Sequence, residues 1–66
     1  MIIHLNGLEE TVPEGLTITG LIEQVKEGDP HLMVEVNHRY IYPKDYDTCQ
    51  ILENDEIEFI NPDLGG

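Results

Sequence analysis

The two glycines that close the sequence are its strongest candidate for chemistry. Gly65 and Gly66 follow the residues NPDL at positions 61–64. A glycine pair can enter a channel too narrow for any Cβ, and it can adopt φ values that other residues avoid. The group that it presents is the α-carboxylate of Gly66, whose pKa of about 3.5 keeps it ionised at neutral pH. A carboxylate donates its acyl group only after activation, for example as an acyl-adenylate, and we therefore expect the reactive group at Gly66.

The residues before the glycine pair are expected to form an extended connection between the last strand and the glycines. The residues after Phe59 span at most about 25 Å when extended. Pro62 cannot donate a hydrogen bond to a sheet and stiffens the departure from it. We expect residues 1–60 to form one domain and residues 61–66 to form a flexible tail, in which Asp63 and Leu64 contact a partner and Leu64 is the apolar anchor. The alternative is a frayed chain end, where small residues are also common.

Other residues that could do chemistry lack the neighbours that such chemistry needs. Cys49 is the single cysteine and has no basic residue within several positions, so nothing in the sequence lowers its pKa, and we expect a small structural hydrophobe. The three histidines, His4, His31 and His38, are dispersed and lack the short paired spacings of zinc motifs. The elements expected below, one helix on one sheet, also offer little concavity for a catalytic cleft. We expect a protein that is not a catalyst by itself and that binds no cofactor or metal.

The charge balance limits the partners that the chain can bind. Fourteen Asp and Glu residues stand against three Lys and Arg residues, for a net charge of -11. Nucleic acid and anionic membranes would be repelled, because both need cationic side chains, whereas a basic protein partner is complementary. The alternative is that the acidic surface only keeps a small domain soluble. A signal peptide and an apolar run long enough to span a membrane are both missing from the sequence, and an unpaired cysteine fits a reducing compartment. We expect a cytoplasmic protein.

Apolar residues alternate with a period of two in several segments, which predicts strands. The expected strands lie at residues 1–5, 8–12, 32–36, 39–42 and 56–60. Asn6-Gly7 is a strong hairpin signal because both positions tolerate positive φ, and Asn37-His38 is a second turn candidate. Residues 43–55 have weak periodicity and predict turns or a 3₁₀ segment.

One helix is expected between the second and third strands. Ile18, Leu21, Ile22 and Val25 form one apolar stripe at helical spacing, which indicates core packing. Thr17 can serve as the N-cap. The helix is expected to place Lys26 in its last turn and to stop at Gly28 and Pro30.

This order of elements predicts an α+β domain. We expect a β-grasp, with a mixed four- to five-stranded sheet and one main helix packed on one face. The other face is then solvated, as the outward positions of the last strand indicate. The residues expected to bind a partner are Glu56, Glu58 and Phe59, together with Asp63 and Leu64 of the tail.

Several stretches of the chain resemble the ThiS-type sulfur carrier proteins, relatives of MoaD and of ubiquitin-like modifiers. The opening MIIHLNG is similar to that family's first strand and Asn-Gly turn. VEVN at residues 34–37 and IYPKDYDTCQILENDEIEFI at residues 41–60 are similar to its later strand, Pro turn and acidic approach to the last strand. GG at residues 65–66 matches its reactive terminus. The resemblance covers essentially the whole chain.

The resemblance implies a reaction cycle in which the chain is a co-substrate. A ThiF/MoeB-like enzyme uses ATP to adenylate Gly66, and a sulfur donor protein converts the adenylate to a thiocarboxylate. In ThiS-like proteins a ThiG-like thiazole synthase accepts the sulfur for thiamine, whereas in MoaD-like proteins the acceptor is molybdopterin. The chain lacks the longer helical insertions of MoaD-like proteins, which favours thiamine. A non-covalent acidic adaptor is the alternative from another class, and an enzyme that uses Cys49 is the weakest alternative.

Overall fold

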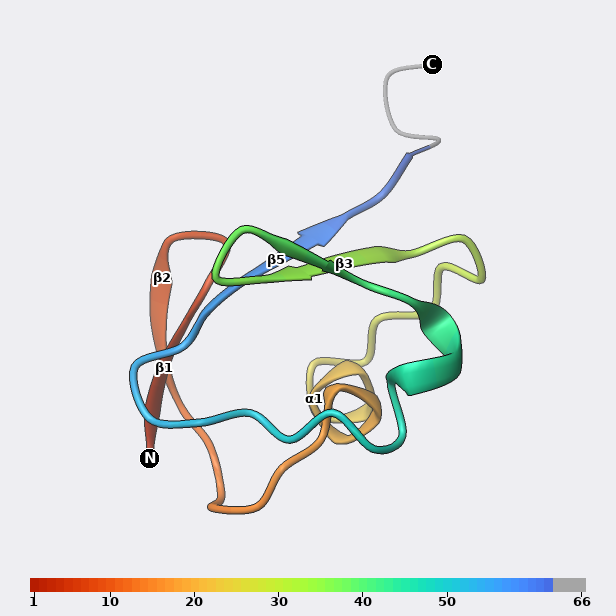
Figure 1. Ribbon diagram of the computed structural model, residues 1–66. Helices are drawn as coiled ribbons and strands as arrows, with labels where there is room; N and C mark the ends of the chain where they lie inside the picture. The colour runs from red at the N-terminus through yellow and green to blue at the C-terminus, as the bar shows by residue number, and fades with distance from the viewer. Residues whose placement is uncertain (63–66) are drawn as a thin grey trace.

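The alternating segments of the sequence pair into one mixed sheet, in the strand order β2-β1-β5-β3-β4. The computed structural model describes residues 1–62. The strands are β1 (Ile2–Leu5), β2 (Leu8–Thr11), β3 (Met33–Val36), β4 (Arg39–Ile41) and β5 (Glu56–Ile60), and α1 (Ile18–Gln24) and the 3₁₀ helix η1 (Pro43–Asp45) connect them. Residues 1–62 thus form a sheet of five strands and one α-helix, and the helix lies on one side of the sheet (Figure 1). The predicted β-grasp is confirmed.

The centre of the sheet holds the strand that leads to the C-terminal tail. β5 pairs in parallel with β1 and antiparallel with β3. β2 and β4 form the two edges through antiparallel hairpins with β1 and β3. β1 pairs with β5 only at Glu56 and Ile57, whereas β3 pairs with it as far as Ile60, so the end of β5 is held chiefly from the β3 side.

Both hairpins turn where the sequence predicts. Asn6 and Gly7 have φ values of 51° and 82°, and Asn37 and His38 have φ values of 51° and 68°. Two successive positive φ values define the turn that matches the twist of paired strands. The asparagine-led dipeptides therefore set the register of the hairpins, and their prediction is confirmed.

The core lies between α1 and one face of the sheet. The sheet contributes Ile3, Val34, Ile57 and Phe59, all buried, and α1 contributes Ile18 and Leu21. Val12, Leu32 and Ile51, from the segments between, complete the cluster. The alternation that predicts the third and last strands places Leu32, Val34, Ile57 and Phe59 in the core, and Val36 is half-buried and packs against it. Val36 is the last residue of β3.

The first turn of α1 forms as expected. The Thr17 hydroxyl accepts a hydrogen bond from the Gly20 N–H at 3.1 Å, so Thr17 is the N-cap. A side chain at position 20 would clash with Leu16, because a Cβ there would lie 2.6 Å from Leu16 Cδ1. The apolar residue before the cap thus covers the first turn of the helix, and the glycine leaves room for it.

The end of α1 corrects the prediction. The helix stops at Gln24, and Lys26 lies outside it with a φ of 58°. The Lys26 N–H donates to Glu23 O at 3.1 Å, and the Glu27 N–H donates to Ile22 O at 3.0 Å. These two bonds form a Schellman motif, which places a residue with left-handed geometry directly after the cap. Lys26, and not Gly28, is that residue, and the stop therefore comes earlier than the glycine and proline signals suggest.

Smaller differences concern the limits of the elements. Val25, predicted on the apolar stripe, is 39% exposed, because the helix ends before this position turns toward the core. β3 begins one residue later and β4 ends one residue earlier than predicted, and Tyr42 caps η1 instead of extending β4. In the part of the chain that the structure describes, no helix is long and apolar enough to cross a membrane.

Candidate functional site

The face of the sheet opposite α1 is the second surface that β5 helps to form. Neighbouring strand residues point to opposite faces, so the neighbours of the core residues lie on this side. We call it the outer face. Its members are Ile2, His4, Glu9, Thr11, Met33, Glu35, Tyr40, Tyr42, Glu56, Glu58 and Ile60.

The middle of the outer face is acidic. Glu58 of β5 lies directly opposite Glu35 of β3 in the register of the sheet. His4 of β1 is paired with Glu56 on one side and with Glu9 on the other. Like charges directly opposite each other destabilise a sheet, by about 0.2–1 kcal/mol for a pair. The Glu35–Glu58 pair is therefore a cost to the fold that a basic partner could offset.

The end of the outer face nearest the tail is apolar. Ile60 pairs with Met33 in the register, and Tyr40 and Tyr42 lie on β4 and just after it. The two tyrosine rings pack edge to face with centroids 5.0 Å apart, and they are 43% and 59% exposed. We call Met33, Tyr40, Tyr42 and Ile60 the tail-side patch. Exposed aromatic residues beside an apolar strand end are typical of the anchors of a protein interface.

The structure brings some of the expected partner-binding residues to this surface. Glu56 and Glu58 are exposed on the outer face. Phe59 is a correction: its side chain is only 9% exposed and packs in the core on the α1 side, so it holds β5 in place and has no access to a partner there. Residues 63–66, which include the expected Asp63 and Leu64 contacts and both glycines, lie outside the described residues.

Two asparagines hold β5 in ways that the sequence patterns did not reveal. Asn6 Oδ1 accepts a hydrogen bond from the Phe59 N–H at 2.8 Å, which continues the pairing of β1 with β5. Asn37 Oδ1 accepts from the Glu56 N–H at 3.0 Å, and its Nδ2 donates to the buried Asp55 carboxylate at 3.0 Å. The sequence predicts both asparagines as turn formers. In the structure both side chains also bond to the central strand.

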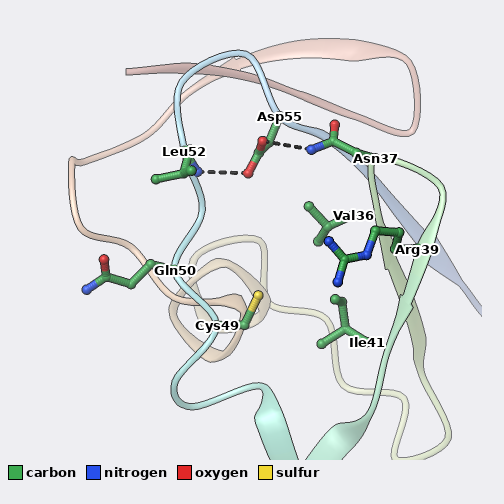
Figure 2. A pocket seen from close by; sticks show the side chains of 8 residues that line it. All are labelled: Val36, Asn37, Arg39, Ile41, Cys49, Gln50, Leu52 and Asp55. Carbon is green, nitrogen blue, oxygen red and sulfur yellow. Dashed lines mark hydrogen bonds between the residues drawn. The ribbon is translucent and has the colours of Figure 1, made fainter.

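A hollow of about 250 Å³ opens between the β3–β4 hairpin and residues 49–55, away from the outer face (Figure 2). Its walls include Val36, Ile41 and Leu52, with Arg39 and Cys49 beside them. Figure 2 shows the Asp55 carboxylate between Leu52 and Asn37, and it accepts from both, with the Leu52 N–H at 2.8 Å. No oxygen of this carboxylate is left without a donor.

Cys49 is poorly suited to act as a nucleophile. It is half-buried and packs against the core, as the sequence predicts. Burial, followed by the charges of Asp55 and Asp45, raises the pKa of the Cys49 thiol above its ordinary value, although Arg39 opposes this. The thiolate is the nucleophilic form. In residues 1–62 no group of three or more His, Cys, Asp or Glu side chains is arranged to hold a metal ion. The chemistry of the chain is therefore to be sought at the tail.

A mixed sheet with a parallel central strand pair and one helix on one of its faces defines a β-grasp domain. The chain belongs to the ThiS family, whose model matches residues 2–66. The members of this family are sulfur carriers of thiamine biosynthesis and not enzymes.

Solved structures agree with this family. The crystal structure of the thiamine biosynthesis protein ThiS from Geobacter metallireducens matches with a TM-score of 0.88 and 28% identity, over 100% of both chains. An NMR solution structure of a thiamine biosynthesis protein from the same organism matches with a TM-score of 0.82 and 28% identity, over 100% of this chain and 88% of that one. No curated protein matches the chain.

Proposed function

We propose that this chain is a sulfur carrier that works through the carboxylate of Gly66. The observation that carries the proposal is the match of the ThiS family to residues 2–66, a range that includes both glycines. The fold supports it, because the strand that leads to the tail is the central one, held by a strand on each side. The domain thus presents a tail whose reaction takes place inside another protein.

The proposed reaction has two steps. The Gly66 carboxylate attacks the α-phosphorus of ATP in an adenylating enzyme of the ThiF/MoeB type, and pyrophosphate leaves. Sulfide (HS⁻) supplied by the sulfur donor then attacks the acyl carbon of the adenylate, AMP leaves, and loss of the S–H proton gives the thiocarboxylate. No side chain of the carrier is needed in either step. Its contribution is to deliver the glycines, which a narrow channel admits because they lack Cβ atoms.

The outer face is the proposed docking surface for that enzyme. The tail-side patch lies at the end of β5, so a partner that covers it receives the tail directly. The acidic residues beside the patch, Glu35, Glu56 and Glu58, would face a basic region of the partner. Complementary charges of this kind raise the association rate and fix the orientation of docking.

The test is ATP–pyrophosphate exchange by the adenylating enzyme. We expect exchange with the full chain and none with a chain that lacks Gly66, whose fold is preserved because the core lies within residues 1–60. A matched control is the Tyr42→Ala chain, which keeps the glycines and should support exchange with a raised KM. Equal exchange with and without Gly66 would contradict the proposal.

The acceptor of the sulfur is the finer part of the proposal. We propose a ThiG-like thiazole synthase, since the similar solved structures are thiamine biosynthesis proteins. A MoaD-like role in molybdopterin synthesis is the alternative. The thiocarboxylated chain should support thiazole formation by thiazole synthase, and it should fail to support molybdopterin formation by a molybdopterin synthase subunit. The reverse result would assign the chain to the other pathway.

A non-covalent adaptor is the second candidate, and the acidic outer face is the observation that favours it. In that case deletion of Gly65 and Gly66 would leave partner binding and cellular function unchanged, while charge reversal at Glu56 and Glu58 would impair both. The sulfur carrier requires the opposite ranking, with the glycine deletion more damaging than the charge changes.

A further inference from the structure

Asn61, the first residue after β5, is held by its side chain. Its Nδ2 donates a hydrogen bond to Glu27 Oε1 at 3.2 Å and another to Asp29 Oδ2 at 3.0 Å. Both acceptors lie in the connection between α1 and β3, more than thirty positions away in the sequence. We call Glu27, Asp29 and Asn61 the Asn61 clamp. A side-chain amide has two N–H donors, and here each donor has its own carboxylate.

Both carboxylates are also held by backbone N–H groups of their own connection. Glu27 Oε2 accepts from the Asp29 N–H at 3.2 Å, and Asp29 Oδ1 accepts from the His31 N–H at 2.8 Å. Each carboxylate therefore uses one oxygen for the backbone of its own connection and the other for Asn61. The Asn61 amide and then the His31 N–H hold the pKa of the Asp29 carboxyl below its ordinary value of 3.8.

The pairing of the strands does not need the clamp. β5 is already fixed through its last residue, because Ile60 pairs with Met33. Two carboxylates that converge on one amide repel each other, and the chain already has a net charge of -11. Because the amide is neutral, it offsets this repulsion only weakly, and the clamp therefore adds little to the stability of the fold. What the clamp adds is a fixed position for the first residue beyond the sheet. From there, the stretch to Gly66 reaches at most about 17 Å.

We propose that Asn61 is a positioning residue that fixes the point and direction in which the carrier tail leaves the domain. This inference rests on the proposed function, since it concerns the delivery of Gly66 to the adenylating enzyme. Restricting a segment in its bound arrangement beforehand lowers the cost of binding. The gain in affinity from the clamp cannot exceed the entropy cost of ordering the backbone of one residue, which corresponds to a factor of roughly five to thirty. Because the clamp lies at the surface, we expect a smaller effect, a three- to tenfold change in KM.

An exchange of amide and acid groups tests the clamp. Asn61→Asp replaces the donor with a third carboxylate and should open the clamp. The triple variant E27Q/D29N/N61D should close it again with the bonds reversed. The new amide oxygens at positions 27 and 29 still accept the backbone N–H groups, and their NH₂ groups donate to the new carboxylate at position 61. Gln50→Glu is the matched control, because it makes the same amide-to-acid change at an exposed position in another part of the fold.

The first measurement needs no enzyme. A ¹³C NMR titration of the Asp29 carboxyl should give a midpoint below 3.8 in the wild-type chain, and a higher midpoint in the Asn61→Ala variant. Equal midpoints in the two chains would show that the clamp does not form in solution. Thermal melting of all variants checks that the fold is kept.

The second measurement is the KM of the adenylating enzyme for the carrier. We expect N61D to raise KM three- to tenfold with kcat within twofold, the triple variant to restore KM, and Gln50→Glu to leave it unchanged. A wild-type KM for N61D would overturn the proposal, as would a folded triple variant that stays as poor as N61D. A wild-type chain that is not adenylated at all would overturn the sulfur-carrier function itself, and the Asp29 titration would still decide whether the clamp exists.

Discussion

Removal of one charge from the outer face should stabilise the protein and weaken its docking. The change is Glu58→Gln, which keeps the size of the side chain and ends the repulsion with Glu35 directly across the sheet. Residues in such a pair have Cβ atoms about 4.5–5.5 Å apart. Two like charges placed opposite each other in this way lower the stability of the fold.

The size of the gain follows from the geometry of the pair. Like charges directly opposite in a sheet cost about 0.2–1 kcal/mol, and the exposure of Glu58 favours the middle of that range. In a domain of this size, 1 kcal/mol shifts the melting temperature by about 4–8 °C. We therefore expect Glu58→Gln to melt about 2–4 °C higher at low ionic strength, and the gain should shrink in 1 M salt, where the Debye length is about 3 Å.

The assay combines thermal melting with binding kinetics. The control is Glu23→Gln, which removes the same charge from the exposed side of α1, away from the outer face. Association of Glu58→Gln with the adenylating enzyme should slow by roughly 1.5- to 5-fold, the equivalent of one surface ion pair. Association of the control should change less.

Two results would refute this reasoning. A Glu58→Gln chain that melts no higher than the Glu23→Gln control would show that the cross-strand repulsion is negligible. A stabilised chain that associates at the wild-type rate would show that the acidic band does not face the partner, and the docking surface would then be the tail-side patch alone.

Further predictions concern the helix end, the helix start, the thiol and one carboxyl group. Lys26→Gly should raise the free energy of unfolding by about 1 kcal/mol, because Lys26 adopts a positive φ that glycine adopts without strain; chemical denaturation measures it, and Lys26→Ala should bring no such gain. Thr17→Ala should lower the free energy of unfolding by about 1 kcal/mol through loss of the N-cap, again by denaturation, and an unchanged stability would contradict the cap assignment. Cys49→Ala should accept sulfur at the wild-type rate in the adenylation and sulfur-transfer assay, and the wild-type thiol should alkylate slowly at neutral pH because burial raises its pKa. The folded-state pKa of Asp29 is lowered from 3.8, chiefly by the Asn61 amide, so its contribution to stability is present above that pH and is lost as the pH falls through the folded-state value; the free energies of unfolding of wild-type and Asn61→Ala chains should therefore differ above pH 3.8 and converge as the pH falls below it, as acid titration measures.

The parts of the fold that the sequence predicted are those with local causes. Asn6-Gly7 and Asn37-His38 form turns because the residues themselves favour positive φ. The alternation in Glu56–Ile60 reports which side of the strand is buried, and so it predicted the inward phase of Ile57 and the outward phase of Glu58. Thr17 was recognisable as a cap from its type and its place before an apolar stripe.

The end of the helix was predicted wrongly because its cause is not local. Gly28 and Pro30 are stronger stop signals than any residue before them, but the helix ends once it has no more core to cover. Val25 already points toward solvent. The chain then turns at Lys26, in spite of the strain that a side chain brings to a positive φ, because it must return to the sheet.

Most of the site depends on contacts between distant residues, which local patterns do not contain. Asn6 and Phe59 are 53 residues apart and share a hydrogen bond. The sequence places Asn61 at the start of a tail, whereas the structure bonds it to Glu27 and Asp29, which lie more than thirty positions away. The Glu35–Glu58 pair likewise became visible only when the register between β3 and β5 was known.

The intact mass of the chain after incubation with ATP, the adenylating enzyme and a sulfur source tests the central claim most directly. The sulfur-carrier account predicts that one oxygen is exchanged for one sulfur, that fragmentation places the sulfur on Gly66, and that a chain without Gly66 shows no exchange. An unchanged mass for the full chain, with an enzyme that thiocarboxylates another carrier of the ThiS family, would contradict the account.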